Sequence, residues 1–201
     1  MFAKGRNEIQ TSIEDMAQAI KILAYDINEF YTDKIKTIES KIEEVKKQNA
    51  GIADEEIGVL NYYNCQLLEI FSNSHIEAME TIVSKVYSYA ETHMQMIVEN
   101  IGYNSKKVSK EYSKDGQPEK GVSDVEKMFY IIKKYYSLPY SALTDVWNSF
   151  HDIHKLRNDI VHKYNHERQY IKIEYIIQNL DQVEEMLKVI ECVVRTSKEA
   201  K

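Results

Sequence analysis

The chain has 201 residues, 43% of them hydrophobic, and a formal net charge of −6 at pH 7. This length and apolar content suffice for a buried core, so a chain that is disordered throughout is not expected. Only two prolines and six glycines interrupt it. Apolar residues recur at three- and four-residue spacing along most of its length, which predicts an all-α protein.

The apolar residues and the cysteines also indicate where in the cell the protein is found. No run approaches the roughly 18 uninterrupted apolar residues of a membrane helix, and charges are spread throughout residues 1–30. We therefore expect a soluble protein with no membrane partner. The two cysteines, Cys65 and Cys192, lie far apart in apolar-periodic surroundings. This favours reduced core thiols over a disulfide or a metal pair and indicates a cytoplasmic location.

The N-terminal half predicts two long helices that form a hairpin. Residues 8–49 carry apolar side chains in alternating steps of four and three, the pattern of a coiled-coil seam. Gly51 ends this helix, and the acidic residues 54–56 suit the positive end of a second helix that runs towards Ile101. We expect residues 1–52 to act as a scaffold or a dimer interface. The apolar positions of the second helix are Ile57, Leu60, Leu67, Phe71, Ala78, Ile82, Val86 and Ala90.

Residues 102–121, GYNSKKVSKEYSKDGQPEKG, interrupt the periodic pattern and predict a mobile, lysine-rich loop. Its lysines suit either a solvated linker or contact with a phosphate backbone, and the sequence leaves both readings open. The charge of the chain is uneven, because residues 51–100 are strongly acidic whereas residues 101–172 carry an excess of lysine and arginine.

Two further helices flank a histidine-rich stretch. Ser123 and Glu126 have the spacing of a capping box, which predicts a shorter helix that ends by Leu138, just before a proline. A last helix is expected from about residue 167 to 198. Its inward-facing residues are Ile173, Ile176, Ile177, Leu180, Val183, Leu187, Ile190 and Val194. No glycine-rich phosphate loop or G-x-S-x-G elbow is present, which excludes nucleotide-loop enzymes and serine hydrolases.

The stretch 141–170 holds four of the six histidines. Read as a helix, the whole stretch has a broad apolar sector and an opposite polar one, and we expect the helix itself over 142–164. The apolar sector contains Leu143, Val146, Trp147, Phe150, Ile153, Leu156, Ile160, Val161 and Tyr164, and the polar one contains His151, His154, Lys155, Asn158, His162 and His166. Arg157 departs from this division, since it follows Ile153 by four residues and precedes Ile160 by three. A guanidinium on an apolar face needs a partner or a functional reason.

The octapeptide RNDIVHKY, residues 157–164, resembles the R-x4-6-H signature of the HEPN superfamily. These are small α-helical proteins found among prokaryotic toxins, abortive-infection proteins and nuclease modules of CRISPR effectors. Arg157 fits the family arginine, Asn158 the polar residue that follows it, and His162 the family histidine. Tyr164 fits the R-x4-H-x-Y form of toxins paired with nucleotidyltransferase antitoxins. The resemblance implies a HEPN-like antiparallel helical bundle over residues 53–201, to which the long N-terminal helix is an addition.

The resemblance also implies an activity, namely metal-independent cleavage of RNA to a 2′,3′-cyclic phosphate and a 5′-hydroxyl by a toxin or abortive-infection effector. The residue types suit it, because histidine transfers protons near neutral pH and a guanidinium binds phosphate. We expect Arg157, His162 and Asn158 to be catalytic, with no metal or other cofactor. The RNA-binding or accessory residues are Lys155, Lys163, His154 and Tyr164. The implied partners are RNA, a second copy of the chain, and an antitoxin or a phage-derived activator.

Two alternatives stay open. A long helical hairpin, an acidic exterior and fifteen tyrosines also suit a non-catalytic interaction or RNA-binding module. The histidine spacings of three and four residues are compatible with a metal-binding bundle, which would need ligands from other helices. His93 and the exposed-looking His75 are the candidates for such ligands.

Helix geometry favours a site shared between two chains. Five residues advance an ideal helix by about 500°, so Arg157 and His162 point about 140° apart. Either the helix is distorted near Val161, or a second copy faces the first across a two-fold axis and both chains line one cleft. We therefore expect a homodimer.

Overall fold

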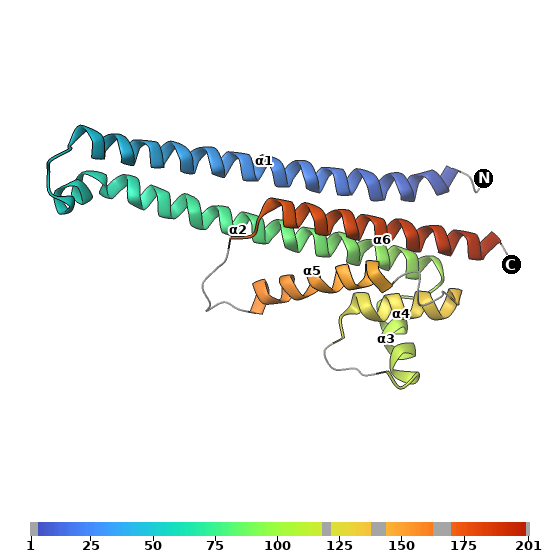
Figure 1. The fold of residues 1–201 in the computed structure, drawn as a ribbon. Coiled ribbons are helices and arrows are strands. Elements are labelled where there is room, and N and C mark those ends of the chain that lie inside the picture. Colours follow the sequence, from blue (N-terminus) through green and yellow to red (C-terminus); the bar gives the residue numbers. More distant parts are fainter. Residues whose placement is uncertain (1–3, 118–121, 138–143, 163–169, 200–201) are drawn as a thin grey trace.

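The computed structural model describes residues 4–117, 122–137, 144–162 and 170–199, and these residues form helices joined by short connections (Figure 1). The helices are α1 (Lys4–Gln48), α2 (Asp54–Asn100), α3 (Ser105–Lys114), α4 (Asp124–Tyr136), α5 (Thr144–His162) and α6 (Ile173–Glu199). The all-α prediction is confirmed.

Helices α1 and α2 form a long antiparallel hairpin, and α6 packs against both of them (Figure 1). The turn of the hairpin contains Gly51, whose φ of 110° is open to glycine and strained for other residues. Acidic residues occupy the first turn of α2, as predicted. The two long helices and the turn between them therefore follow directly from the sequence pattern.

The core lies where α6 covers the hairpin and where α4 and α5 cover α2. In the first half of α1 the buried residues Ile13, Ala17, Ile20 and Ala24 alternate in size, and Ile38 is buried further along the helix. Tyr170, just before α6, contacts Asn28 of α1 and His75 of α2. The hairpin extends past the start of α6 (Figure 1). We call residues 29–74 the distal arm.

The distal arm exposes several large apolar side chains, since α1 and α2 are the only described helices that pack there. Leu60, predicted to face inward, is 54% exposed. The other strongly exposed apolar residues of α2 in this arm are Val59, Tyr62, Tyr63 and Ile70. The buried residue at this level is the neighbouring Asn61, which is 3% exposed and whose Nδ2 donates to the carbonyl oxygen of Ile42 at 3.4 Å. The face of α2 that α1 covers is therefore not the one that contains Leu60, and the predicted inward position of Leu60 is wrong.

The predicted loop over 102–121 is wrong in its first part, because residues 105–114 form α3. The Asn104 side chain caps this helix by accepting a hydrogen bond from the backbone N–H of Lys107 at 2.9 Å. Val108 and Tyr112 lie four residues apart and are both buried. One apolar turn packed against α4 is enough to order a segment that its lysine content suggests is a loop. Lys120 lies outside the described residues.

Helix α4 begins with the predicted capping box. The Ser123 side chain accepts from the backbone of Glu126, and the Glu126 carboxylate accepts from the backbone of Ser123. The helix ends at Tyr136, where Ser137 adopts a left-handed conformation with φ of 53°. Helix α6 starts at Ile173, later than predicted, and residues 170–172 precede it without helical structure.

Both cysteines are exposed, so the prediction of core thiols is wrong. Cys65 lies on α2 in the distal arm and Cys192 lies on α6. Within the described ranges, no helix combines the length and apolar character needed to span a bilayer.

Candidate functional site

Helix α5 is positioned by a ladder of stacked rings. Trp147 of α5 stacks on Phe129 of α4 with ring centres 4.2 Å apart. Phe150, which is completely buried, stacks on Tyr87 of α2 at 5.7 Å. His154 stacks on the same Tyr87 ring at 5.4 Å. Because these rings come from α2, α4 and α5, they fix how α5 is rotated about its axis.

The Arg157 side chain is half-buried and is held from two directions. Its Nη1 donates a hydrogen bond to Asn158 Oδ1 at 3.1 Å. Its guanidinium carbon lies 5.3 Å from the centre of the Tyr87 ring. Among the described side chains no carboxylate forms an ion pair with it. The partner that the sequence required is therefore an aromatic face and an amide, which leave the positive charge unneutralised by any described acid.

Asn158 connects Arg157 to His154. Its Nδ2 lies 2.9 Å from Nε2 of His154, one helical turn earlier. His154 was predicted to lie on the polar, outward sector, whereas it is half-buried against Tyr87 and Phe150. The reason is that the Tyr87 ring of α2 lies beside α5 at the level of His154.

Burial lowers the pKa of His154. Glu126 opposes this effect, while His151 and Arg157 add to it. The His154 imidazole is therefore neutral at pH 7. His151 is exposed, and its Nδ1 lies 3.4 Å from Oε1 of Glu126, the capping residue of α4.

His162 is the last helical residue of α5, and its side chain is outside the described part of the structure. Lys163, Tyr164 and His166 also lie outside it. Lys155 is described and exposed. Because α5 is helical from Thr144 through His162, Arg157 and His162 start from directions about 140° apart. His154 lies three residues before Arg157 on the same side of α5, and both contact Asn158.

Among the described residues, no group of three or more histidine, cysteine, aspartate or glutamate side chains is arranged to hold a metal ion. The expectation that His75 is exposed is wrong. His75 is 3% exposed, stacks on Tyr31, and shares Asn28 Oδ1 with the Tyr170 hydroxyl. His93 is also buried, with Nδ1 3.0 Å from the carbonyl oxygen of Tyr89.

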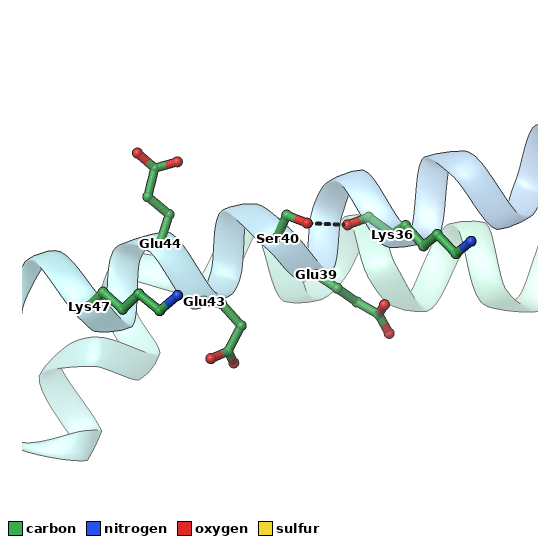
Figure 2. A pocket seen from close by; sticks show the side chains of 6 residues that line it. All are labelled: Lys36, Glu39, Ser40, Glu43, Glu44 and Lys47. Carbon is green, nitrogen blue, oxygen red and sulfur yellow. Dashed lines mark hydrogen bonds between the residues drawn. The ribbon is translucent and has the colours of Figure 1, made fainter.

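Figure 2 shows a shallow hollow on the surface of α1 in the distal arm. Its lining residues are Lys36, Glu39, Ser40, Glu43, Glu44 and Lys47. All of them belong to one helix, and the Ser40 hydroxyl donates to the backbone carbonyl of Lys36 at 2.8 Å. The hollow is the space between long side chains of α1 and not a cleft between elements. We assign it no function.

Sequence reasoning missed Tyr87 as a site residue. Tyr87 lies on α2, and nothing in its local pattern distinguishes it from neighbouring apolar positions. It becomes important only because α5 crosses α2 at this point and directs Phe150, His154 and Arg157 at its ring.

Comparisons with known proteins add no relative, since no protein-family model, curated protein or solved structure matches the chain. The function is therefore inferred from the RNDIVHKY motif and from the geometry of α5.

Proposed function

We propose that the protein is a metal-independent endoribonuclease of HEPN type, in which Arg157, Asn158 and His162 carry the reaction. It cleaves RNA to a 2′,3′-cyclic phosphate and a 5′-hydroxyl. The biological role that we propose is that of a toxin or abortive-infection effector against phage. An antitoxin or a phage-derived protein would control it.

The observation that carries this proposal is the environment of Arg157. A half-buried guanidinium is costly unless something uses its charge, and its described contacts are the Tyr87 ring and the amide of Asn158. Both contacts hold the group without neutralising it. Such an arginine is suited to bind a phosphate, and the negative charge that grows on the phosphate in the transition state strengthens that contact.

The proposed chemistry needs only proton transfer and charge stabilisation. A histidine accepts the proton of the RNA 2′-hydroxyl while the 2′-oxygen forms a bond to phosphorus. The bond from phosphorus to the 5′-oxygen then breaks, and a protonated histidine supplies the proton of the new 5′-hydroxyl. Arg157 binds a non-bridging phosphate oxygen throughout. The products are the cyclic phosphate and the 5′-hydroxyl, with no water consumed.

We further propose that two copies of the chain share the site. On an ideal helix Arg157 and His162 point about 140° apart, so one helix cannot easily present both side chains to one phosphate. A two-fold axis near the C-terminal end of α5 would bring the arginine and the histidine of both copies to one cleft. One histidine would then act as the base and the other as the acid.

The decisive experiment is cleavage of total RNA by purified protein in the presence of EDTA, followed by analysis of the RNA ends. We expect cleavage to persist in EDTA and the ends to be a cyclic phosphate and a 5′-hydroxyl. Cleavage that EDTA abolishes would instead favour a metal-binding bundle. The absence of cleavage under all conditions, with folded protein, would reject the enzyme.

A second candidate function is a non-catalytic interaction module, favoured by the distal arm. Val59, Tyr62, Tyr63 and Ile70 of this arm are each more than half exposed. Exposed apolar surface of this kind marks a protein-interaction site when the residues are contiguous. If the wild-type protein binds RNA without cleaving it, and His162→Ala binds equally well, this function replaces the endoribonuclease.

A further inference from the structure

Hydrogen bonds link His154 through Asn158 to Arg157, and the donor and the acceptor of each bond can be assigned. An asparagine amide has one acceptor oxygen and one donor nitrogen. The oxygen accepts from Arg157 at 3.1 Å and the nitrogen faces His154 Nε2 at 2.9 Å. His154 Nε2 must therefore be the acceptor, which assigns the proton of the neutral imidazole to Nδ1.

Protonation of His154 is incompatible with this arrangement. The imidazolium carries a hydrogen on Nε2, which would face the amide hydrogens of Asn158. Rotation of the amide by 180° would satisfy His154 but would turn the amide nitrogen towards the Arg157 guanidinium, which is also a donor. Either orientation loses one of the two hydrogen bonds. Only the neutral imidazole supports both.

We propose that His154 is a positioning residue that, through Asn158, holds the Arg157 guanidinium in its binding orientation. The catalytic consequence rests on the proposed function, whereas the hydrogen-bond chain itself can be tested without RNA. The role differs from that of an RNA-binding group, because the Nε2 atom is already occupied by Asn158. It also differs from that of a catalytic base, which must reach the substrate.

The surroundings of His154 keep its imidazole neutral. Tyr87 of α2 and Phe150 cover its ring. Burial lowers the pKa of His154. Of the described charged and titratable groups around it, Glu126 of α4 raises this pKa, while His151 and Arg157 lower it. The net shift of the His154 pKa is downward, so the hydrogen-bond chain through Asn158 is intact at neutral pH. It breaks as the pH falls through the pKa of His154.

Nitrogen-15 NMR of the histidine side chains tests the hydrogen bonds between His154, Asn158 and Arg157 directly. The His154 signals are assigned by their absence from His154→Gln. We expect a neutral imidazole protonated on Nδ1 at pH 7, and a pKa that rises in Asn158→Ala because the donor to the neutral form is gone. A wild-type imidazole protonated on Nε2, or a pKa unchanged by Asn158→Ala, would overturn the proposal.

Two substitutions of His154 separate positioning from packing. His154→Phe keeps a ring against Tyr87 but has no acceptor, whereas His154→Gln loses the ring and keeps an acceptor at the reach of Nε2. We expect kcat/KM for RNA cleavage to fall about tenfold or more in His154→Phe and to be largely rescued in His154→Gln. Protonation of His154 should lower kcat/KM at acid pH in the wild-type protein, and this acid limb of the pH profile should be absent from His154→Gln.

A purely structural role would give the opposite order, with the ring-retaining variant more active. Equal activity of both variants, or an unchanged acid limb in His154→Gln, would also overturn positioning. Binding of an uncleavable 2′-O-methyl oligonucleotide is measured in parallel. If the wild-type protein binds this oligonucleotide through Arg157 but cleaves no RNA, the proposed enzyme activity is rejected. Weaker binding by His154→Phe than by His154→Gln would in that case still support the positioning role of His154.

Discussion

The guanidinium carbon of Arg157 lies 5.3 Å from the centre of the Tyr87 ring, so a residue of α2 positions the motif arginine of α5. A contact of this kind contributes about 0.5–2 kcal/mol, depending on how far it is removed from water. Tyr87 is 7% exposed and also receives the rings of Phe150 and His154. The position of the arginine is therefore coupled to the packing of the helices.

Replacement of Tyr87 tests this coupling. Tyr87→Phe keeps the ring, so we expect RNA cleavage within a few fold of wild type. Tyr87→Leu removes the aromatic face and should lower cleavage by tenfold or more, with a loss of roughly 2–4 kcal/mol in the free energy of unfolding. Urea unfolding and a cleavage assay on the same preparations measure both effects. Equal activity of the two variants would show that the ring does not position Arg157.

Substitution of Arg157 tests its role in phosphate binding. We expect Arg157→Ala to lose cleavage, and Arg157→Lys to remain well below wild type because an ammonium lacks the planar fork that makes two hydrogen bonds to a phosphate. Arg195→Ala, which removes an exposed arginine of α6, is the matched control and should retain activity. Full activity of Arg157→Lys would mean that charge alone is sufficient.

The shared site makes a prediction about mixtures. Light scattering after gel filtration should give a mass near twice 23.6 kDa. His162→Ala should abolish cleavage with little change in the far-ultraviolet CD signal. Excess His162→Ala protein, given time to exchange, should depress wild-type activity below the value expected from dilution. A fully active monomer at nanomolar concentration contradicts the shared site.

An ion-pair cluster joins α1 to α6 and predicts a pH dependence. Glu184 accepts from Lys188 at 2.7 Å and from Lys21 at 3.1 Å. Burial alone would raise the pKa of Glu184, but the hydrogen bonds from the two lysines outweigh it and leave the pKa below its ordinary value. The stabilisation is therefore present above the unfolded-state pKa, near pH 4, and is lost as the pH falls through the folded-state pKa.

We accordingly expect Glu184→Gln to lower the free energy of unfolding by about 1 kcal/mol at pH 7. The difference from wild type should shrink as the pH falls below about 4 and the carboxylate becomes protonated. Glu43→Gln, which breaks a pair with Lys46 within the exposed face of α1, is the control and should have no measurable effect. A difference that persists unchanged at pH 3 would mean that the charge of Glu184 does not stabilise the fold.

Buried His75 predicts a second pH dependence. Burial lowers its pKa, so the folded state binds its proton less readily than the unfolded state does. Stability should therefore fall as the pH drops from about 6.5 towards the folded-state pKa, and then level off. His75→Gln keeps a donor for Asn28 and does not titrate. Its unfolding free energy should decline less than that of wild type between pH 7 and pH 5, as urea titrations can measure.

The sequence by itself determined the helices other than α3 and much of their limits. Apolar steps of three and four residues specify a helix because they place the residues that can be buried on one side of it. Gly51 and the pair of Ser123 and Glu126 specify turns and caps, because their chemistry satisfies backbone groups locally. The anomaly of Arg157 was also visible, since it depends only on the spacing within one helix.

Only the tertiary structure decided which helical faces are covered, because that depends on the lengths and crossings of other helices. It buried His75 where α1, α2 and Tyr170 meet, and left Cys65 exposed on an arm that α6 does not reach. It ordered residues 105–114 against α4. It also moved His154 from the predicted polar surface to the Tyr87 ring, because a ring on α2 lies beside α5 at that level. A helix pattern fixes the direction of a side chain relative to its own axis, whereas the identity of its neighbour requires the packing of the whole chain.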